Sequence, residues 1–459
     1  MKKTITMGAA LGIISISAQT NPAITDWLFN TDGTTARHYV SGNSTPINDA
    51  DLVNVQSVEY SNDYSYIMST GLPSYIIGPY LDGNPSQASD NQHIFKIPLA
   101  PVENTGTLTS TPFGSIGVFV NGVPMYDYKD GSSYSLSGGA DAGGPSGGTG
   151  DGVWNRDAIK AENDGFDCAK GHPSPIFSGG GGPGGTLTGG TYHHHQNPSA
   201  FNLDLVELSD VCDMYLADGL YVVDAAVHSP LLGYAFDGFP IYGAYSYANT
   251  DGTGAIKRIE SSYTVRNISV RTHYADGSDV TDGPAVSTTY PLGQYREDYE
   301  YIAGSGDLDE HNGRFCITPE YPNGIYCYFS TVDANWNSAY PYVVGPEYYG
   351  TVAGGKVSSI TEATTVYTAV VSINELEQID FSVFPNPASD FIAVQFKGLL
   401  EVNLTVELYD IAGKLMQTST ILKGSTISYV DTRTLYNGNY VIRVTDGNNE
   451  ISKKIVVSK

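Results

Sequence analysis

The chain has 459 residues, a formal net charge of -26 at pH 7 and a pI of about 4.5. This length favours two or three domains, and the charge repels nucleic acid and anionic membrane surfaces while it attracts cations. With 41% hydrophobic and 11% aromatic residues the composition is that of folded domains, so we expect no nucleic-acid partner and no extended disorder.

The first residues predict export. Two lysines directly follow Met1, an apolar run covers residues 4–17, and small residues before Gln19 offer a cleavage site. We therefore expect a signal peptide over residues 1–18. No later stretch reaches the roughly 18 uninterrupted apolar residues that a membrane helix needs, so no transmembrane segment is expected.

Hydrophobic residues alternate with polar ones in most of the chain, which is typical of half-buried strands. Asn121-Gly122 between two apolar runs predicts a hairpin within residues 115–128. A helical pattern is found only over 154–164, and it is short. The prediction is a mainly β fold, with strands expected over 93–99, 263–274, 325–332 and 404–410.

Residues 138–190 are very rich in glycine. A phosphate-binding loop would need Lys followed by Ser or Thr after its glycines, and none follows here. We interpret this region as long loops inserted into the β-rich domain.

The four cysteines fit an oxidising compartment, and three pairings are conceivable. Residues 314–329 resemble a hairpin, with two apolar runs around a Pro-Asn-Gly turn, which favours a Cys316–Cys327 disulfide. A Cys168–Cys212 bond would then bracket the segment that contains three consecutive histidines.

Aromatic residues become rare after about residue 351, and we place a linker at 356–379. Residues 380–459 then contain about seven short runs with strand patterns, as in a small β-sandwich. The expected organisation is a signal peptide, a large β-rich domain with long Gly-rich loops over 19–355, the linker, and the sandwich.

The last region carries a resemblance. A Pro-Asn-Pro turn at 385–387, a Tyr-Asp-x-x-Gly-Lys turn at 409–414 and a Gly-x-Tyr-x-Val strand at 438–442 follow one another in order. Together they resemble the type A C-terminal sorting domain of the type IX secretion system. The resemblance implies that residues 380–459 engage the secretion machinery, and that the protein is secreted or attached to the outer cell surface.

Three histidines in a row, His193 to His195, stand in the segment 189–198. Side chains alternate between the two faces of a strand, so His193 and His195 project to one side and His194 with Tyr192 to the other. Two imidazoles on one face can bind one metal ion at about 2.0–2.1 Å.

A third ligand must come from elsewhere in the chain. Three further histidines stand beside glycine or proline in loops, where sites are often built. These candidates are His172, His228 and His311.

The histidine-bearing region resembles the YHYH domain proteins. The resemblance rests on the segments 116–127, 171–175, 190–198, 228–245, 308–329 and 340–346, which follow in consistent order. The third position of the name-giving motif is His194 here, where the family has Tyr. The two same-face histidines are retained, so the departure concerns only the residue on the opposite face. The resemblance implies a domain and its motifs but no activity.

Histidine-rich sites suit zinc, copper or iron better than magnesium, and we expect a transition metal, zinc or copper. Asp237, Asp309 and Glu310 are the carboxylates nearest in sequence to candidate histidines and would complete the ligands or orient one of them. An open coordination position would permit hydrolysis, and copper among tyrosines would permit redox chemistry. Whether the protein is an enzyme stays open at this point.

Two other functions remain open. The 34 tyrosines are compatible with a non-catalytic surface module that binds a small molecule, a glycan or a protein. A purely structural envelope protein would bind neither metal nor glycan. The histidines could also be polar edge-strand residues packed on tyrosines.

Overall fold

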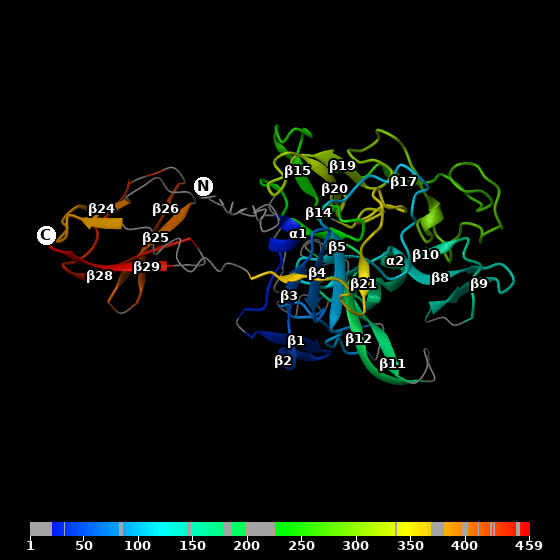
Figure 1. Ribbon diagram of the computed structural model, residues 1–459, viewed down its shortest axis with the longest axis horizontal. Coiled ribbons are helices and arrows are strands. Elements are labelled where there is room, and N and C mark those ends of the chain that lie inside the picture. Colours follow the sequence, from blue (N-terminus) through cyan, green and yellow to red (C-terminus); the bar gives the residue numbers. More distant parts are fainter. Residues whose placement is uncertain are drawn as a thin grey trace, which may run out of the picture. The chain divides into compact units, whose positions relative to one another are not determined.

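The computed structural model describes most of the chain, namely residues 21–31, 33–81, 86–144, 148–178, 185–198, 225–335, 337–368, 381–396, 403–411, 413–422, 425, 427–446 and 450–459. The predicted signal peptide and Cys212 lie outside these residues. The chain divides into two compact units, Met1–Tyr367 and Thr368–Lys459 (Figure 1). No helix in the described part is long and apolar enough to span a membrane.

The regular secondary structure of the larger unit is mainly β-strand. Its helical elements are α1 (Pro22–Thr25), α2 (Ala158–Glu162) and the single 3₁₀ turns η3 (Asn163–Gly165) and η5 (Arg296–Asp298). Its strands are β1 (Thr35–Val40), β2 (Asn43–Leu52), β3 (Val55–Tyr60), β4 (Tyr64–Ser69), β5 (His93–Pro98), β6 (Ser115–Phe119), β7 (Pro124–Tyr126), β8 (Lys129–Ser135), β9 (Ala140–Gly143), β10 (Asn155–Asp157), β11 (Gly171–Ser178), β12 (Thr186–His194), β13 (Leu231–Ala235), β14 (Pro240–Tyr242), β15 (Tyr245–Tyr247), β16 (Ile256–Arg258), β17 (Tyr263–Val265), β18 (Tyr299–Tyr301), β19 (Gly313–Cys316), β20 (Ile325–Phe329), β21 (Gly355–Val357) and β22 (Thr365–Val366).

Two sheets organise this unit. The first has eight strands in the order β11-β12-β7-β6-β13-β14-β20-β19, and the second has five in the order β21-β5-β4-β3-β22. The pairs β12–β7 and β14–β20 are parallel, and the other neighbours in both sheets are antiparallel. Strands β21 and β22 show that part of the segment 356–379 pairs with this unit.

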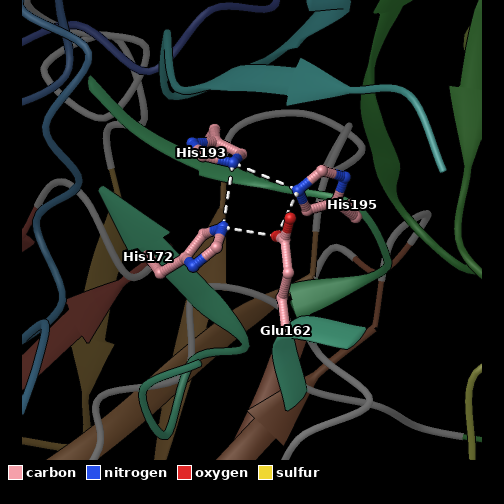
Figure 2. A group of neighbouring side chains, drawn as sticks. All are labelled: Glu162, His172, His193 and His195. Atoms are coloured by element: carbon pink, nitrogen blue, oxygen red, sulfur yellow. Dashed lines mark hydrogen bonds and ion pairs between the residues drawn. The ribbon is translucent and has the colours of Figure 1, made fainter. Parts of the chain in front are cut away.

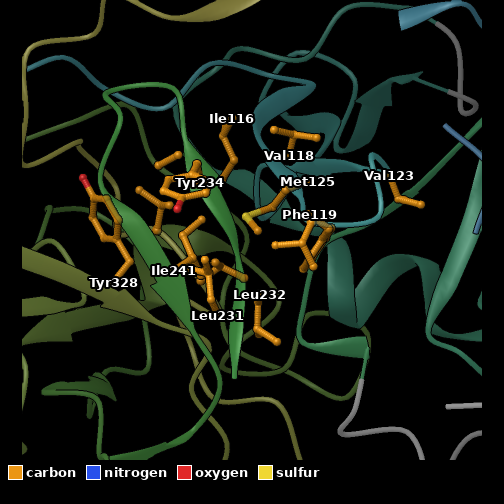
Figure 3. Packing of buried hydrophobic residues seen from close by; sticks show 14 of the residues in the cluster. Ile116, Val118, Phe119, Val123, Met125, Leu231, Leu232, Tyr234, Ile241 and Tyr328 are labelled. Carbon is orange, nitrogen blue, oxygen red and sulfur yellow. The ribbon is translucent and has the colours of Figure 1, made fainter. Parts of the chain in front are cut away.

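One hydrophobic core joins the two sheets. Ile67 and Phe95 of the five-stranded sheet belong to the same buried cluster as Val118, Tyr234 and Ile241 of the eight-stranded sheet. Figure 3 shows the share contributed by β6, β7, β13 and β14. This core fixes the strands beside β12, and β12 carries the triple histidine.

Strands β6 and β13 approach each other closely because glycines lie between them. A Cβ atom on Gly233 would lie 2.2 Å from the carbonyl oxygen of Val118, and one on Gly117 would lie 2.6 Å from that of Tyr234. Only glycine permits this approach, since a real Cβ atom would displace the neighbouring backbone.

The predicted hairpin around Asn121-Gly122 is confirmed, because β6 and β7 are antiparallel and Gly122 has a φ of 79°. The strand predicted over 263–274 was too long, since β17 ends at Val265. Beyond it, the Arg266 guanidinium donates to the carbonyl oxygens of His273 and Tyr274, so these groups serve a side chain instead of a neighbouring strand.

The predicted Cys316–Cys327 disulfide is wrong, because both thiols are free and buried. The hairpin itself is present, but its register pairs Cys316 with Ile325 and Cys327 with Arg314. The two cysteines are therefore diagonal instead of directly opposite, and their thiols are in contact without a bond between them. Cys168 is disulfide-bonded, and since Cys212 lies outside the described residues, that pairing stays a prediction.

The smaller unit has two sheets, as expected for the C-terminal region. Their buried residues form one core, which includes Phe381, Val394, Leu408 and Ile442. The sheet orders are β23-β24-β27 and β26-β25-β28-β29, built from β23 (Phe381–Phe384), β24 (Phe391–Phe396), β25 (Leu404–Asp410), β26 (Leu415–Ile421), β27 (Ile427–Asp431), β28 (Gly438–Thr445) and β29 (Glu450–Val457).

A buried histidine makes the larger unit sensitive to acid. His93 is 1% exposed, and neither ring nitrogen has a hydrogen-bond partner within the described residues. Burial, with a smaller contribution from Lys356, lowers the pKa of His93 to about 3. In the unfolded chain the pKa of this histidine is near 6.5. The buried neutral ring therefore carries no protonation penalty above that pH, and the free energy of unfolding decreases as the pH falls from 6.5 toward 3.

We predict that a His93→Leu variant loses less stability on acidification than the wild type. Urea unfolding at pH 7 and pH 4, followed by intrinsic fluorescence, gives the two free energies of unfolding. The loss between these pH values should be larger in the wild type by up to roughly 3 kcal/mol. Equal losses in both proteins would contradict the assignment, since contributions common to both cancel.

Candidate metal centre

Four donor atoms from three elements converge at one end of β12 (Figure 2). The Nε2 atom of His193 lies 3.1 Å from Nε2 of His172 and 3.1 Å from Nε2 of His195. Oε2 of Glu162 lies 2.9 Å from Nε2 of His172 and 3.3 Å from Nε2 of His195. We call these residues the histidine–glutamate group. Within the described ranges, no second group of three or more His, Cys, Asp or Glu donors converges in this way.

Strand pairing places the three histidines. The antiparallel register of β11 and β12 sets His172 directly opposite His193. His195 follows the end of β12, two residues beyond His193, and therefore projects to the same side. The expected common face of His193 and His195 is thus observed.

The backbone fixes the tautomers of two rings. Nδ1 of His193 lies 2.9 Å from the carbonyl oxygen of Thr191, and Nδ1 of His195 contacts the carbonyl oxygen of Asp127. A carbonyl oxygen only accepts hydrogen bonds, so both Nδ1 atoms carry hydrogen and both neutral rings present a lone pair at Nε2. With both rings neutral, two lone pairs would therefore face each other at 3.1 Å.

Glu162 completes the group from the last position of α2. This helix begins after Asp157, whose side chain accepts a hydrogen bond from the backbone N–H of Lys160. The other oxygen of Asp157 accepts from the hydroxyl of Tyr342 at 2.7 Å. No sequence motif marks Glu162, and its only signal was its place in the short helical pattern at 154–164.

Burial and mutual contact determine the charges in the group. Burial, reinforced by His172 and His195, lowers the pKa of His193 well below its ordinary value, so this ring is neutral. Burial opposes ionisation of Glu162, but its contacts with His172 and His195 outweigh burial and lower its pKa. Burial likewise opposes protonation of His195, and contact with Glu162 outweighs it and raises the pKa.

The spacing of the four donor atoms fits a small cation. Four ligands about 2.0–2.1 Å from a tetrahedral ion lie roughly 3.3 Å from one another. Four of the six donor-to-donor distances are 2.9–3.3 Å, close to that spacing, and all four atoms lie within 4.8 Å of one another. Three nitrogens and one carboxylate oxygen are ligands of zinc or copper.

Comparison with known families agrees with this architecture. A family described as "YHYH protein" matches residues 94–341, more than half of the chain. The chain belongs to the YHYH family. A second family, described as "Secretion system C-terminal sorting domain", matches residues 382–458. The C-terminal unit is thus a sorting domain of type IX secretion, and the protein is exported by that route to the cell surface or the medium.

One curated relative also matches part of the chain. It is an endo-acting ulvan lyase from Formosa agariphila, 35% identical over 100 residues. The match covers 22% of this chain and 19% of the lyase, so the chain spans about a fifth of that relative's length.

The opposite face of β12 in the YHYH domain is also buried. His194, which replaces the Tyr of the family motif, is 0% exposed and lies 2.5 Å from the hydroxyl of Tyr75. Its Nδ1 atom lies 2.9 Å from the carbonyl oxygen of Lys170. Burial lowers the pKa of His194 to about 3. This residue is therefore neutral and held by the structure on the side away from the histidine–glutamate group.

His228 and His311 do not join the group. Nε2 of His228 lies 3.0 Å from Oγ of Ser246, and its Nδ1 lies 2.7 Å from the carbonyl oxygen of Ser229. Nδ1 of His311 lies 2.9 Å from the carbonyl oxygen of Glu347. Both rings thus have partners in other parts of the domain.

The carboxylates that the sequence favoured as ligands are not part of the histidine–glutamate group, and Asp237 and Asp309 have hydrogen-bond partners elsewhere. Asp237 accepts from the Tyr328 hydroxyl at 2.5 Å and from the N–H of Gly350 at 2.9 Å. Asp309 accepts from the N–H groups of His311 and Gly313. Glu310 is likewise not part of the group, and the carboxylate found there is that of Glu162.

We predict that the two faces of β12 respond differently to substitution. His194→Asn should lower the free energy of unfolding by about 1–3 kcal/mol, because Tyr75 and Lys170 lose a buried partner, and should leave the metal content unchanged. His193→Asn should lower the metal content. Urea unfolding and elemental analysis of both variants test this, and loss of metal in His194→Asn alone would contradict it.

Proposed function

We propose that the YHYH domain of this exported protein binds one transition-metal ion, zinc or copper, through Glu162, His172, His193 and His195. The observation that supports this most strongly is the contact of two backbone-fixed imidazoles through their Nε2 lone pairs at 3.1 Å. Such an arrangement is repulsive unless an electron-pair acceptor lies between the rings.

A proton is the alternative acceptor, and it fits less well. One proton on His195 would satisfy its contact with Glu162 or with His193, but not both contacts at once. An ion bonded to all four atoms would relieve every close contact in the group. The charge of -26 on the whole chain also favours a cation.

The proposed role is to hold the domain together. Four protein donors would fill the shell of a four-coordinate ion without a water molecule, as in structural sites. The three histidines are buried, and the Glu162 side chain is only 20% exposed. A bound ion would tie α2 to β11 and β12.

We predict one equivalent of bound metal in the full-length protein after chelation and reconstitution with zinc or copper. His193→Asn should abolish binding, and Glu162→Gln should weaken it by roughly tenfold or more because the charged donor is lost. The matched controls are His228→Asn and His311→Asn, which should still bind one equivalent. Elemental analysis and the visible spectrum of the cobalt-substituted protein provide the measurements.

Two outcomes would overturn the proposed metal site. Wild-type protein that takes up no zinc, copper or cobalt would exclude the site. Equal metal content in His193→Asn and the wild type would place the ion elsewhere in the chain.

We further predict that metal binding stabilises the larger unit. At a free metal concentration of 100 times Kd the folded state gains about 2.7 kcal/mol, so the melting temperature of the wild type should rise by several degrees on reconstitution. His193→Asn should melt at the same temperature with and without metal. Calorimetry tests this, and an unchanged wild-type melting temperature at full occupancy would contradict a structural role.

A further inference from the structure

A second candidate site is a cavity of about 520 Å³, which none of the four residues of the histidine–glutamate group lines. Its volume is in the range of about 300–1,000 Å³ that is typical of ligand sites. The wall is formed by residues of β10, β17, β18 and η5 and by the loops around Tyr274 and Tyr340. Five tyrosines line it, and we call it the tyrosine cavity: Tyr263, Tyr274, Tyr299, Tyr301 and Tyr340.

The rings of this cavity hold one another in place. Tyr299 stacks on Tyr340 with ring centroids 4.0 Å apart and planes 7° apart. Tyr263 packs against Tyr301 with centroids 5.6 Å apart, and its hydroxyl donates to the carbonyl oxygen of Glu310 at 2.7 Å. Tyr340 is only 5% exposed and supports the rings around it, and a wall that is already ordered binds a ligand at little cost in conformational entropy.

The polar groups of the cavity include both signs of charge. Arg296 lines it beside Glu297, but its Nε atom lies 3.9 Å from Oε1 of that residue, beyond hydrogen-bond distance. Glu297 instead accepts from the backbone and side-chain nitrogens of Asn155, at 2.7 and 2.9 Å. The guanidinium of Arg296 can therefore donate hydrogen bonds to a ligand, and the carboxylates of Glu300 and Glu347 can accept them.

We propose that the tyrosine cavity binds a short stretch of a neutral polysaccharide. Sugar rings present C–H faces that pack on aromatic rings, and their neighbouring hydroxyls pair with guanidinium and carboxylate groups. The lining has four carboxylates, those of Asp276, Glu297, Glu300 and Glu347, against one guanidinium. This negative excess repels polysaccharides made of uronates or sulfated sugars. The site does not depend on the proposed metal ion.

The test is isothermal titration of the full-length protein with defined oligosaccharides. The neutral probes are the hexasaccharides of cellulose, laminarin, xylan and mannan; the acidic probe is hexagalacturonate, and the cationic probe is hexalysine. At least one neutral probe should bind, and Tyr301→Ala should weaken it about tenfold or more. Glu300→Gln, which keeps the shape of the wall, should weaken it by less.

Matched controls separate this site from the fold and from the metal. Tyr436→Ala removes a tyrosine that is 87% exposed outside the cavity and should leave binding unchanged. His193→Asn should also bind the neutral probe normally, so failure of one proposal does not imply failure of the other. Thermal unfolding of Tyr301→Ala checks that it folds. Lack of binding by every neutral probe, binding that Tyr301→Ala does not alter, or preference for the acidic or cationic probe would each overturn the proposal.

Discussion

The antiparallel register of β11 and β12 is the constraint on which the candidate metal centre depends. A slip by one residue would turn every side chain of β12 to the other face and separate His172 from His193. Asp167 pins this register, because it accepts from the N–H of Gly171 in β11 and from the hydroxyl of Tyr192 in β12, at 3.0 and 2.9 Å. A buried carboxylate outside the group thus determines which histidines meet.

At the C-terminal end of β12 both faces of the strand are polar and buried, and their polar groups are satisfied in different ways. On one face Tyr192 and His194 each have a hydrogen-bond partner from another segment, so burial leaves no polar group unsatisfied there. On the other face the Nε2 atoms of the histidines contact one another and the carboxylate of Glu162. Burial without a partner is costly, so a cation is the natural complement of this face alone.

The sequence predicted what is local and missed what the tertiary structure decides. Strand alternation was enough to put His193 and His195 on one face, because it needs only neighbouring residues. His228 and His311 had the same loop context as His172, but only His172 lies on a strand paired with β12. Glu162 could not be found from a motif, because its position depends on a long-range contact. Asp157 caps the helix that carries Glu162, and Asp157 is itself held by the hydroxyl of Tyr342, 185 residues away in sequence. The mainly β fold was predictable because the alternation of apolar and polar residues is also a local pattern. The predicted Cys316–Cys327 bond was wrong because the strand register, which places the two cysteines diagonally, cannot be read from the sequence.

The tyrosine cavity and the histidine–glutamate group share a scaffold without sharing a residue. Asn155 lines the cavity at the start of a short segment, and Glu162 reaches the histidines at its end. Between them Asp157 caps α2 and accepts from Tyr342, which follows the cavity residue Tyr340 by two positions. The two proposed sites therefore lie at opposite ends of one short segment formed by β10 and α2. Because they share no residue, a substitution in one set of side chains tests that site without removing a group from the other.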